Sequence, residues 1–280
     1  MNDDMANWFA QFGGSGDDFD FKKLLAQLQQ AMAPLVGGID GKGIDWSNAK
    51  TSARQVTASL GPDPTPSQRA QQDVAQAAPL ASLWLDEHVD FGPLVTPPAA
   101  WSRAEWVEKT MGAWQTVAEP IVVQIADALA ASFTEQFSAT DELPAELGQF
   151  GAMMAPMLRT SAGAMYATQL SQAIGKISGQ VVSGSEIGIQ LLPAPQVVLL
   201  PTNVDAFSSG LGIPDEDVRI YLAVREGARQ RLFAHVGWLA PQILALLEHY
   251  AREITIDVAA ITSTIEVSDL GSLTPERLAE

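Results

Sequence analysis

The segment from residue 214 to residue 236 constrains the fold most strongly, because several helix signals coincide in it. Pro214 opens the segment, and acidic side chains fill the next turn, where they suit the helix dipole. Apolar positions then recur at spacings of three and four residues, which places them on one helix face. This face also takes in two arginines, in the order Val218, Leu222, Arg225, Arg229, Leu232 and Val236. The pattern predicts a long helix with Arg225 and Arg229 inside its apolar stripe.

Within this helix, the stretch VREGARQRLF at residues 224–233 has the spacing of the zinc-hydrolase motif H-E-x-x-H. In that motif two histidines one turn apart bind the ion, and the glutamate acts as general base. Glu226 stands at the glutamate position, while Arg225 and Arg229 stand at the histidine positions. A guanidinium group only donates hydrogen bonds and stays protonated, so it cannot ligate a cation. We therefore expect no metal at these positions and no cofactor, and Glu226 is the candidate catalytic residue.

Three interpretations of the two arginines remain open on the sequence. In the favoured one they pair with carboxylates, because an inward-facing charge needs compensation. The candidate partners are Glu226, Glu248 and Glu253. In the second, the arginines bind an anion of a partner, such as a carboxylate or a phosphate. In the third, Glu226 and Glu248 form an unusual zinc site with a distant histidine, chosen from His88, His235 and His249.

Two stretches resemble a known family. The sequence YLAVREGARQRLFAHVGWLAPQILALLEHYAREITID, residues 221–257, resembles the signature region of a zincin-like family of actinobacteria, whose members are described as hydrolases or zinc-dependent metalloproteases. The sequence VVLLPTNVDAF, residues 197–207, resembles the strand and loop before that family's motif helix. The resemblance extends over residues 80–280 and is strongest over residues 196–257. Some members of the family are associated with biosynthesis of a deazaflavin cofactor.

The resemblance carries few functional residues over to this chain. Many relatives have R-E-x-x-H, which already lacks the first histidine, whereas here both histidines are replaced. Only Glu226 matches the motif, and the family implies for it the role of general base. Glu248 follows Arg229 at the distance where some zincins take a third, carboxylate ligand. The resemblance thus implies a zincin-like fold, while the motif itself departs from the family pattern.

The rest of the chain reads as mainly helical, with a small amount of strand. Helices are predicted over residues 21–32, 46–61, 67–89, 102–119, 120–137, 147–177 and 240–254. Ser102 and Glu105 have the spacing of a capping box, with Trp101 and Trp106 as a hydrophobic staple. Strands are predicted near residues 178–190, 194–204 and 254–260, where Val, Ile and Leu runs are bounded by Gly and Pro. The expected class is mainly α (α+β), a zincin-like helical domain with a small sheet before the motif helix.

These elements suggest three parts of the chain. Residues 1–20 are rich in Gly and Asp and are expected to be a flexible N-terminus. Residues 21–65 form an N-terminal helical segment, and residues 66–280 form the zincin-like domain. The final stretch GSLTPERLAE has the cap and proline of a helix start, so we expect the domain to be C-terminally incomplete. Trp238 is expected to be a buried anchor of the turn between the last two long helices.

Composition excludes several classes of function. The net charge of −17 argues against nucleic-acid binding and against anionic membrane surfaces. The absence of cysteine rules out disulfides and thiolate metal sites. Asp3 and Asp4 stand where a signal peptide would be basic, and no apolar run is long enough to span a bilayer. We therefore expect a cytoplasmic protein.

Two functions are consistent with these observations. The first is a zincin-like protein without catalytic zinc, which acts as a binding or structural protein with a protein or peptide partner. The alternative is an active metal-dependent hydrolase or peptidase, with zinc held by non-standard ligands and Glu226 as general base. The acidic composition and the aromatic N-terminus also allow a role as an assembly component.

Overall fold

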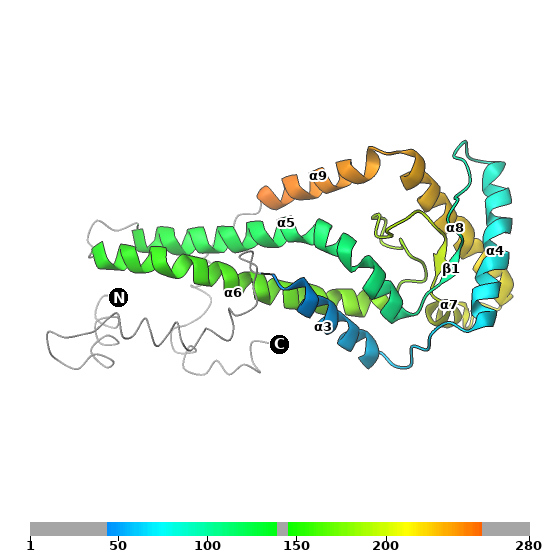
Figure 1. Ribbon diagram of the computed structural model, residues 1–280, viewed down its shortest axis with the longest axis horizontal. Helices are drawn as coiled ribbons and strands as arrows, with labels where there is room; N and C mark the ends of the chain where they lie inside the picture. The colour runs from blue at the N-terminus through cyan, green and yellow to red at the C-terminus, as the bar shows by residue number, and fades with distance from the viewer. Residues whose placement is uncertain (1–43, 139–144, 254–280) are drawn as a thin grey trace. The chain divides into compact units, whose positions relative to one another are not determined.

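The computed structural model describes residues 44–138 and 145–253, and these residues form helices and one small sheet, which lies beside α4 and α8 (Figure 1). The helices are α3 (Trp46–Ser59), α4 (Gln68–Asp86), α5 (Arg103–Ser138), α6 (Ala145–Ser178), α7 (Pro201–Ser208), α8 (Asp215–His235) and α9 (Leu239–Arg252). The strands are β1 (Ala99–Ala100) and β2 (Val198–Leu199). The predicted mainly α class is confirmed, and the sheet precedes α8 as expected.

Two long helices, α5 and α6, lie side by side, and α3 packs against both (Figure 1). Their shared core contains Trp101, Trp106, Trp114 and Ile174, all buried. Helix α3 lies within the N-terminal helical segment expected at residues 21–65, and it packs against α5 and α6. The described residues, 44–138 and 145–253, belong to one compact unit.

Helix α5 is one continuous helix, whereas the sequence predicted two. Pro120 was expected to open the second helix, but it lies inside α5. A helix can contain an interior proline, but it loses one backbone hydrogen bond and is locally distorted there. The start of α5 follows the prediction. The Ser102 amide donates to the Glu105 carboxylate at 2.8 Å, and the Glu105 amide donates to Ser102 Oγ at 3.1 Å, which is a capping box.

The sheet is smaller than predicted and uses a strand that the sequence did not indicate. β1 pairs in parallel with β2, with Ala99 opposite Val198 and Ala100 opposite Leu199. Residues 178–190 were predicted as strand, but apart from the last residue of α6 they form a loop with one bridging residue, Ser183. Residues 201–204, also predicted as strand, begin α7, because Pro201 suits the first turn of a helix.

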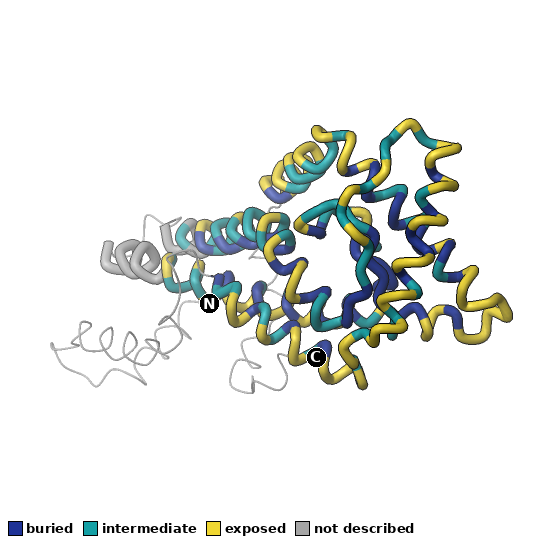
Figure 2. The backbone as a smooth tube through the Cα atoms, turned by 45° about the vertical axis from the view of Figure 1, so that its right-hand side comes forward, coloured by how far each residue is buried: buried dark blue, intermediate teal, exposed yellow. Residues whose placement is uncertain are grey.

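Helix α8 packs against α4 through small residues. Gly227 is the point of close approach, since a Cβ atom there would lie 3.1 Å from Leu85 Cδ1. Ala77, Ala78 and Ala81 of α4 are buried in the same region. Along most helices, buried and exposed residues alternate, as expected for elements that turn one face to a core (Figure 2).

Several predictions lie outside the described residues. They are the flexible N-terminus at residues 1–20, the helix at 21–32, the strand at 254–260 and the helix start at 271–280. Among the described residues, the prediction for Trp238 is also wrong. Trp238 is 68% exposed at the start of α9, so it is not a buried anchor of the turn between α8 and α9. Within residues 44–138 and 145–253, no helix is both long and apolar enough to cross a membrane.

Candidate functional site

The buried side of α8 is rotated from the side that the sequence predicted. Glu226, Gln230 and Arg231 are almost completely buried, at 0%, 0% and 1% exposure. By contrast, the side chains of Arg225 and Arg229 are 29% and 28% exposed. The start of the predicted stripe, Val218 and Leu222, is buried, but its continuation at Leu232 is 38% exposed. Apolar spacing alone misplaced the face because the core around α8 also holds polar side chains.

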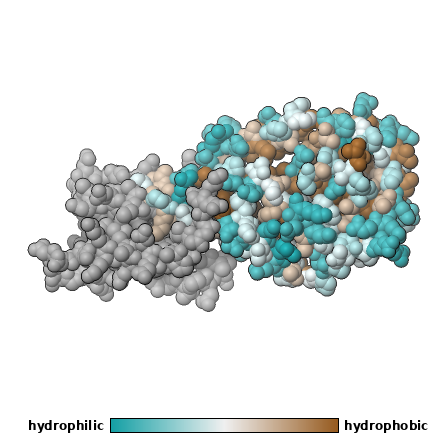
Figure 3. Space-filling model, in the orientation of Figure 1, coloured by the Kyte–Doolittle hydropathy of each residue, from teal (hydrophilic) through white to brown (hydrophobic). Residues whose placement is uncertain are grey.

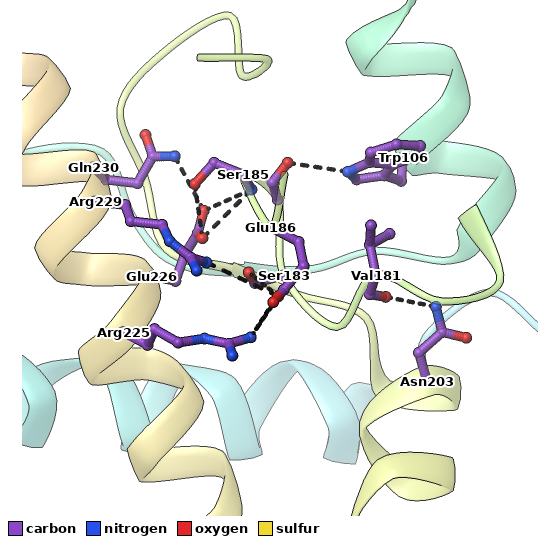
Figure 4. Close-up of polar contacts among 11 residues, drawn as sticks. Trp106, Val181, Ser183, Ser185, Glu186, Asn203, Arg225, Glu226, Arg229 and Gln230 are labelled. Carbon is purple, nitrogen blue, oxygen red and sulfur yellow. Dashed lines mark hydrogen bonds and ion pairs between the residues drawn. The ribbon is translucent and has the colours of Figure 1, made fainter. Parts of the chain in front are cut away.

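Glu226 is enclosed by hydrogen-bond donors from the loop that follows α6 (Figure 4). Its carboxylate accepts from the Ser185 amide at 3.1 Å and from Ser185 Oγ at 2.8 Å. It also accepts from Gln230 Nε2, one turn further along α8, at 3.0 Å. Burial raises the pKa of Glu226 above its ordinary value of 4.5, although these donors and the charge of Arg229 act in the opposite direction. Glu226 is therefore a tightly held buried carboxyl group.

The loop at residues 181–190 brings the serines and Glu186 to α8, and two contacts fix its path. Trp106 Nε1 of α5 donates to the Gly184 carbonyl oxygen at 3.0 Å (Figure 4). A Cβ atom at position 184 would lie 2.8 Å from Leu192 Cδ1 and 3.1 Å from Val198 Cβ, so any larger residue would have to push the Leu192 side chain aside. The loop can pass close to β2 because this residue has no side chain.

Glu186 is the carboxylate partner of the two arginines (Figure 4). Arg225 Nη2 donates to it at 2.5 Å, and Arg229 Nη1 lies 3.9 Å from its Oε2. Ser183 Oγ also donates to Glu186, at 3.0 Å. The favoured arginine–carboxylate network is thus present, but the predicted partners Glu248 and Glu253 are wrong. Both are exposed near the end of α9, which packs against α5.

The residues at the motif positions do not fit a zinc ion. Zinc in proteins takes neutral imidazole, thiolate or carboxylate ligands, and a guanidinium group has no lone pair to offer. Among the residues with described positions, Glu186 is the carboxylate that meets both arginines, and it is already their ion-pair partner. Glu248, the candidate third ligand, is exposed on α9.

The histidines do not supply replacement ligands either. His88, His235 and His249 are all exposed. Among the residues that the structure describes, no three histidine, aspartate or glutamate side chains are grouped so that they could hold a metal.

The sequence analysis missed the most buried cation of α8. Arg231 donates to the carbonyl oxygens of Phe91 at 2.9 Å and Ser82 at 3.1 Å, and to Ser82 Oγ at 2.7 Å. It also forms an ion pair with Asp86 at 2.7 Å. Arg231 therefore ties α8 to α4 and to the chain that leaves α4. It lies five residues after Glu226, off the metal-motif spacing, so a search guided by that motif passes over it.

The comparisons with known proteins agree with this architecture. A crystal structure of a proposed hydrolase with a novel fold, from Chloroflexus aurantiacus, matches with a TM-score of 0.51 and 17% sequence identity. The match covers 75% of this chain and 59% of that protein, so this chain spans less than two thirds of its length, and the likeness bears on the fold alone. No curated protein matches the sequence. The model of the family described as zincin-like metallopeptidase matches residues 44–279, and this chain belongs to that family.

Proposed function

We propose that this chain is a zincin-like protein that does not use catalytic zinc at α8 and acts as a binding protein for a peptide segment of a partner. The observation that carries the proposal is the pairing of Arg225 and Arg229 with Glu186. These arginines take the two positions from which a zincin helix ligates its ion. Because they are permanent cations, they would repel a divalent ion at this place.

The surroundings of Glu226 support the same conclusion. A general base must come within hydrogen-bond reach of the water or substrate from which it takes a proton. Glu226 has no exposed surface, and its oxygens accept from Ser185 and Gln230. The carboxyl group therefore acts as a buried link between α8 and the loop at residues 181–190. No contact among the described residues favours the alternative hydrolase with Glu226 as base and Glu248 as ligand.

Metal content and peptide cleavage test the proposal directly. Purified protein, dialysed against zinc and then against metal-free buffer, is analysed by mass spectrometry for zinc per chain. We expect far less than one zinc per native chain, and cleavage of casein no faster than that of Glu226→Gln. One zinc per native chain, together with casein cleavage that Glu226→Gln abolishes, would overturn the proposal and favour the hydrolase.

A designed site tests whether α8 keeps the geometry of a metal-binding helix. In the double variant Arg225→His, Arg229→His, two imidazoles are presented one turn apart, with the Glu186 carboxylate beside them. We expect this variant to retain zinc and the triple variant that adds Glu186→Gln to retain less. The matched control is Arg219→His, Arg252→His, which places histidines elsewhere on α8 and α9. Equal zinc retention in the double variant and the control would contradict the expectation.

A further inference from the structure

The two arginines at the motif positions have more hydrogen-bond donors than the protein uses. A guanidinium group carries five N–H donors. Arg225 hydrogen-bonds to Glu186 through Nη2 alone, and its Nε is buried without a partner. Arg229 makes no hydrogen bond to any residue that the structure describes, and its buried Nη1 meets Glu186 only across 3.9 Å. Two cations thus share one carboxylate, and several of their N–H donors have no acceptor among the described residues.

The same arginines are accessible from one side of α8. Tyr221, Arg225, Arg229 and Leu232 lie within about 80° of one another around the helix axis, by the rotation of about 100° per residue. We call these four residues the arginine strip. Tyr221 is 56% exposed and Leu232 is 38% exposed, while the arginine side chains keep over a quarter of their surface open. The Arg225 guanidinium lies 5.9 Å from the Tyr221 ring centre. The strip therefore combines two cations with an aromatic and an aliphatic side chain.

Charge limits what such a strip can bind. The two guanidinium groups carry two positive charges and the Glu186 carboxylate one negative charge, while burial raises the pKa of Glu226 beside Arg229, in a chain whose net charge is −17. A ligand with many negative charges is repelled by the rest of the molecule. A single carboxylate matches both the local charge and the planar donor geometry of arginine. The last carboxylate of a polypeptide supplies one such group without further acidic side chains.

We propose that the arginine strip binds the C-terminal carboxylate of a peptide or partner protein whose last residue is apolar. The carboxylate accepts hydrogen bonds from Arg225 and Arg229, and the apolar side chain lies against Tyr221 and Leu232. The proposal rests on the proposed function, because it requires that Arg225 and Arg229 bind a carboxylate and that no zinc ion occupies the space beside them. Glu186 competes with the ligand for the same donors.

A peptide titration followed by NMR tests this proposal. The probes are the tripeptide acetyl-Ala-Ala-Leu with a free C-terminus, the same peptide with a C-terminal amide, and acetyl-Ala-Glu-Leu amide. The readouts are the arginine Nε–H resonances, with that of Arg229 assigned by its loss in Arg229→Gln. We expect the free acid to shift this resonance in a saturable way and the neutral amide to bind about ten-fold more weakly or not at all.

Three variants separate a ligand site from a merely structural ion pair. Arg225→Gln, with the Arg229 resonance still readable, should weaken free-acid binding about ten-fold. Glu186→Gln should strengthen it several-fold, because the competing carboxylate is gone. Arg219→Gln, on the same helix but outside the strip, is the matched control and should leave binding unchanged. Circular dichroism checks that each variant is folded. An arginine variant that fails this check is replaced by the Lys substitution, which loses the planar two-point donor geometry, and Glu186→Gln is replaced by Glu186→Ala.

The outcomes are distinct. Equal binding of free acid and amide, or no binding of the free acid, overturns the proposal. Tighter binding of the glutamate-containing amide than of the free acid overturns the choice of the C-terminus. Mass spectrometry of the peptides after the titration reports on the proposed function instead. If the peptide is cleaved by the native protein but not by Glu226→Gln, the proposed function is contradicted. If the peptide stays intact, the comparison of free acid with amide tests the carboxylate site by itself.

Discussion

Glu226 shows how a residue at a catalytic position can become part of the core. Its carboxyl group has no exposed surface, and its oxygens are held by Ser185 and Gln230. Burial raises its pKa because a charged carboxylate loses its hydration in the protein interior. The folded protein therefore binds this proton more tightly than the unfolded chain does.

This difference predicts a pH-dependent effect of Glu226→Gln. The stabilising contribution of the protonated carboxyl is complete below its ordinary pKa of 4.5 and is lost as pH rises through the raised pKa. Glutamine does not titrate. The free energy of unfolding of the native protein, minus that of Glu226→Gln, should therefore fall from about pH 4.5 upwards and then level off. Urea unfolding followed by tryptophan fluorescence measures it.

The control for this prediction is Glu248→Gln, which removes the same charge from the exposed surface of α9. It corrects for the change in net charge alone. A native-minus-variant difference that stays constant from about pH 4.5 to about pH 8 would contradict the prediction.

Arg231 is a second residue whose role follows from its contacts. Arg231→Leu leaves the acceptors at Phe91, Ser82 and Asp86 without their donor. Leaving buried acceptors without a donor costs about 1–3 kcal/mol for each group, so the total loss should be several kcal/mol. Asp86→Asn should cost less than about 1 kcal/mol, because Asp86 is 46% exposed and the guanidinium keeps its other partners. Urea unfolding of both variants checks this order, and a larger loss in Asp86→Asn would reverse the assignment.

At the scale of elements, α5 contains Pro120 in its interior, where a proline weakens a helix. Pro120 cannot donate to the carbonyl of Thr116, one turn earlier, and its ring crowds that turn. Pro120→Ala should therefore raise the free energy of unfolding by about 1–3 kcal/mol, after allowing for the greater freedom of the unfolded chain. Thermal unfolding measures this change.

The matched control is Pro64→Ala in the exposed connector between α3 and α4. There the substitution only increases the freedom of the unfolded chain, so a small loss of stability is expected. A loss of stability in Pro120→Ala would show instead that the packing of α5 against α6 depends on the distortion at this position.

At the scale of the whole molecule, charge works against the fold. The chain carries a net charge of −17, and hydrophilic residues cover much of the face in Figure 3. Self-repulsion of this size destabilises the compact state. Salt weakens it, since the screening length falls from about 30 Å at 0.01 M to about 3 Å at 1 M. Raising NaCl over this range should increase the free energy of unfolding by about 1 kcal/mol and Tm by roughly 2–4 °C.

A pH series supplies the control for the salt effect. Near the isoelectric point of about 4.4 the net charge vanishes, so the same addition of NaCl should leave Tm almost unchanged. Differential scanning calorimetry at both pH values measures the two responses. A Tm that falls with salt at neutral pH would show that attractive ion pairs, and not repulsion, dominate the electrostatic free energy.

The sequence predicted those features that depend on neighbouring residues. The capping box of Ser102 and Glu105, the helix after Pro214 and the core role of Trp101 and Trp106 all follow from short spacings. The strands were predicted less well, because two-residue strands carry almost no periodic pattern. Pro120 misled the prediction because proline commonly occupies the first turn of a helix, and the sequence does not show that this proline lies inside one.

The sequence by itself determined that α8 is a helix and that guanidinium groups replace imidazoles at its motif positions, because both facts depend on side-chain chemistry and on turns of a few residues. Only the tertiary structure decided which carboxylate meets those arginines. Glu186 is 39 residues from Arg225 along the chain, and it arrives there because Gly184 lets the loop pass close to β2 and Trp106 holds it. Contacts over such separations depend on how whole elements pack, and this packing cannot be predicted from the spacing of neighbouring residues.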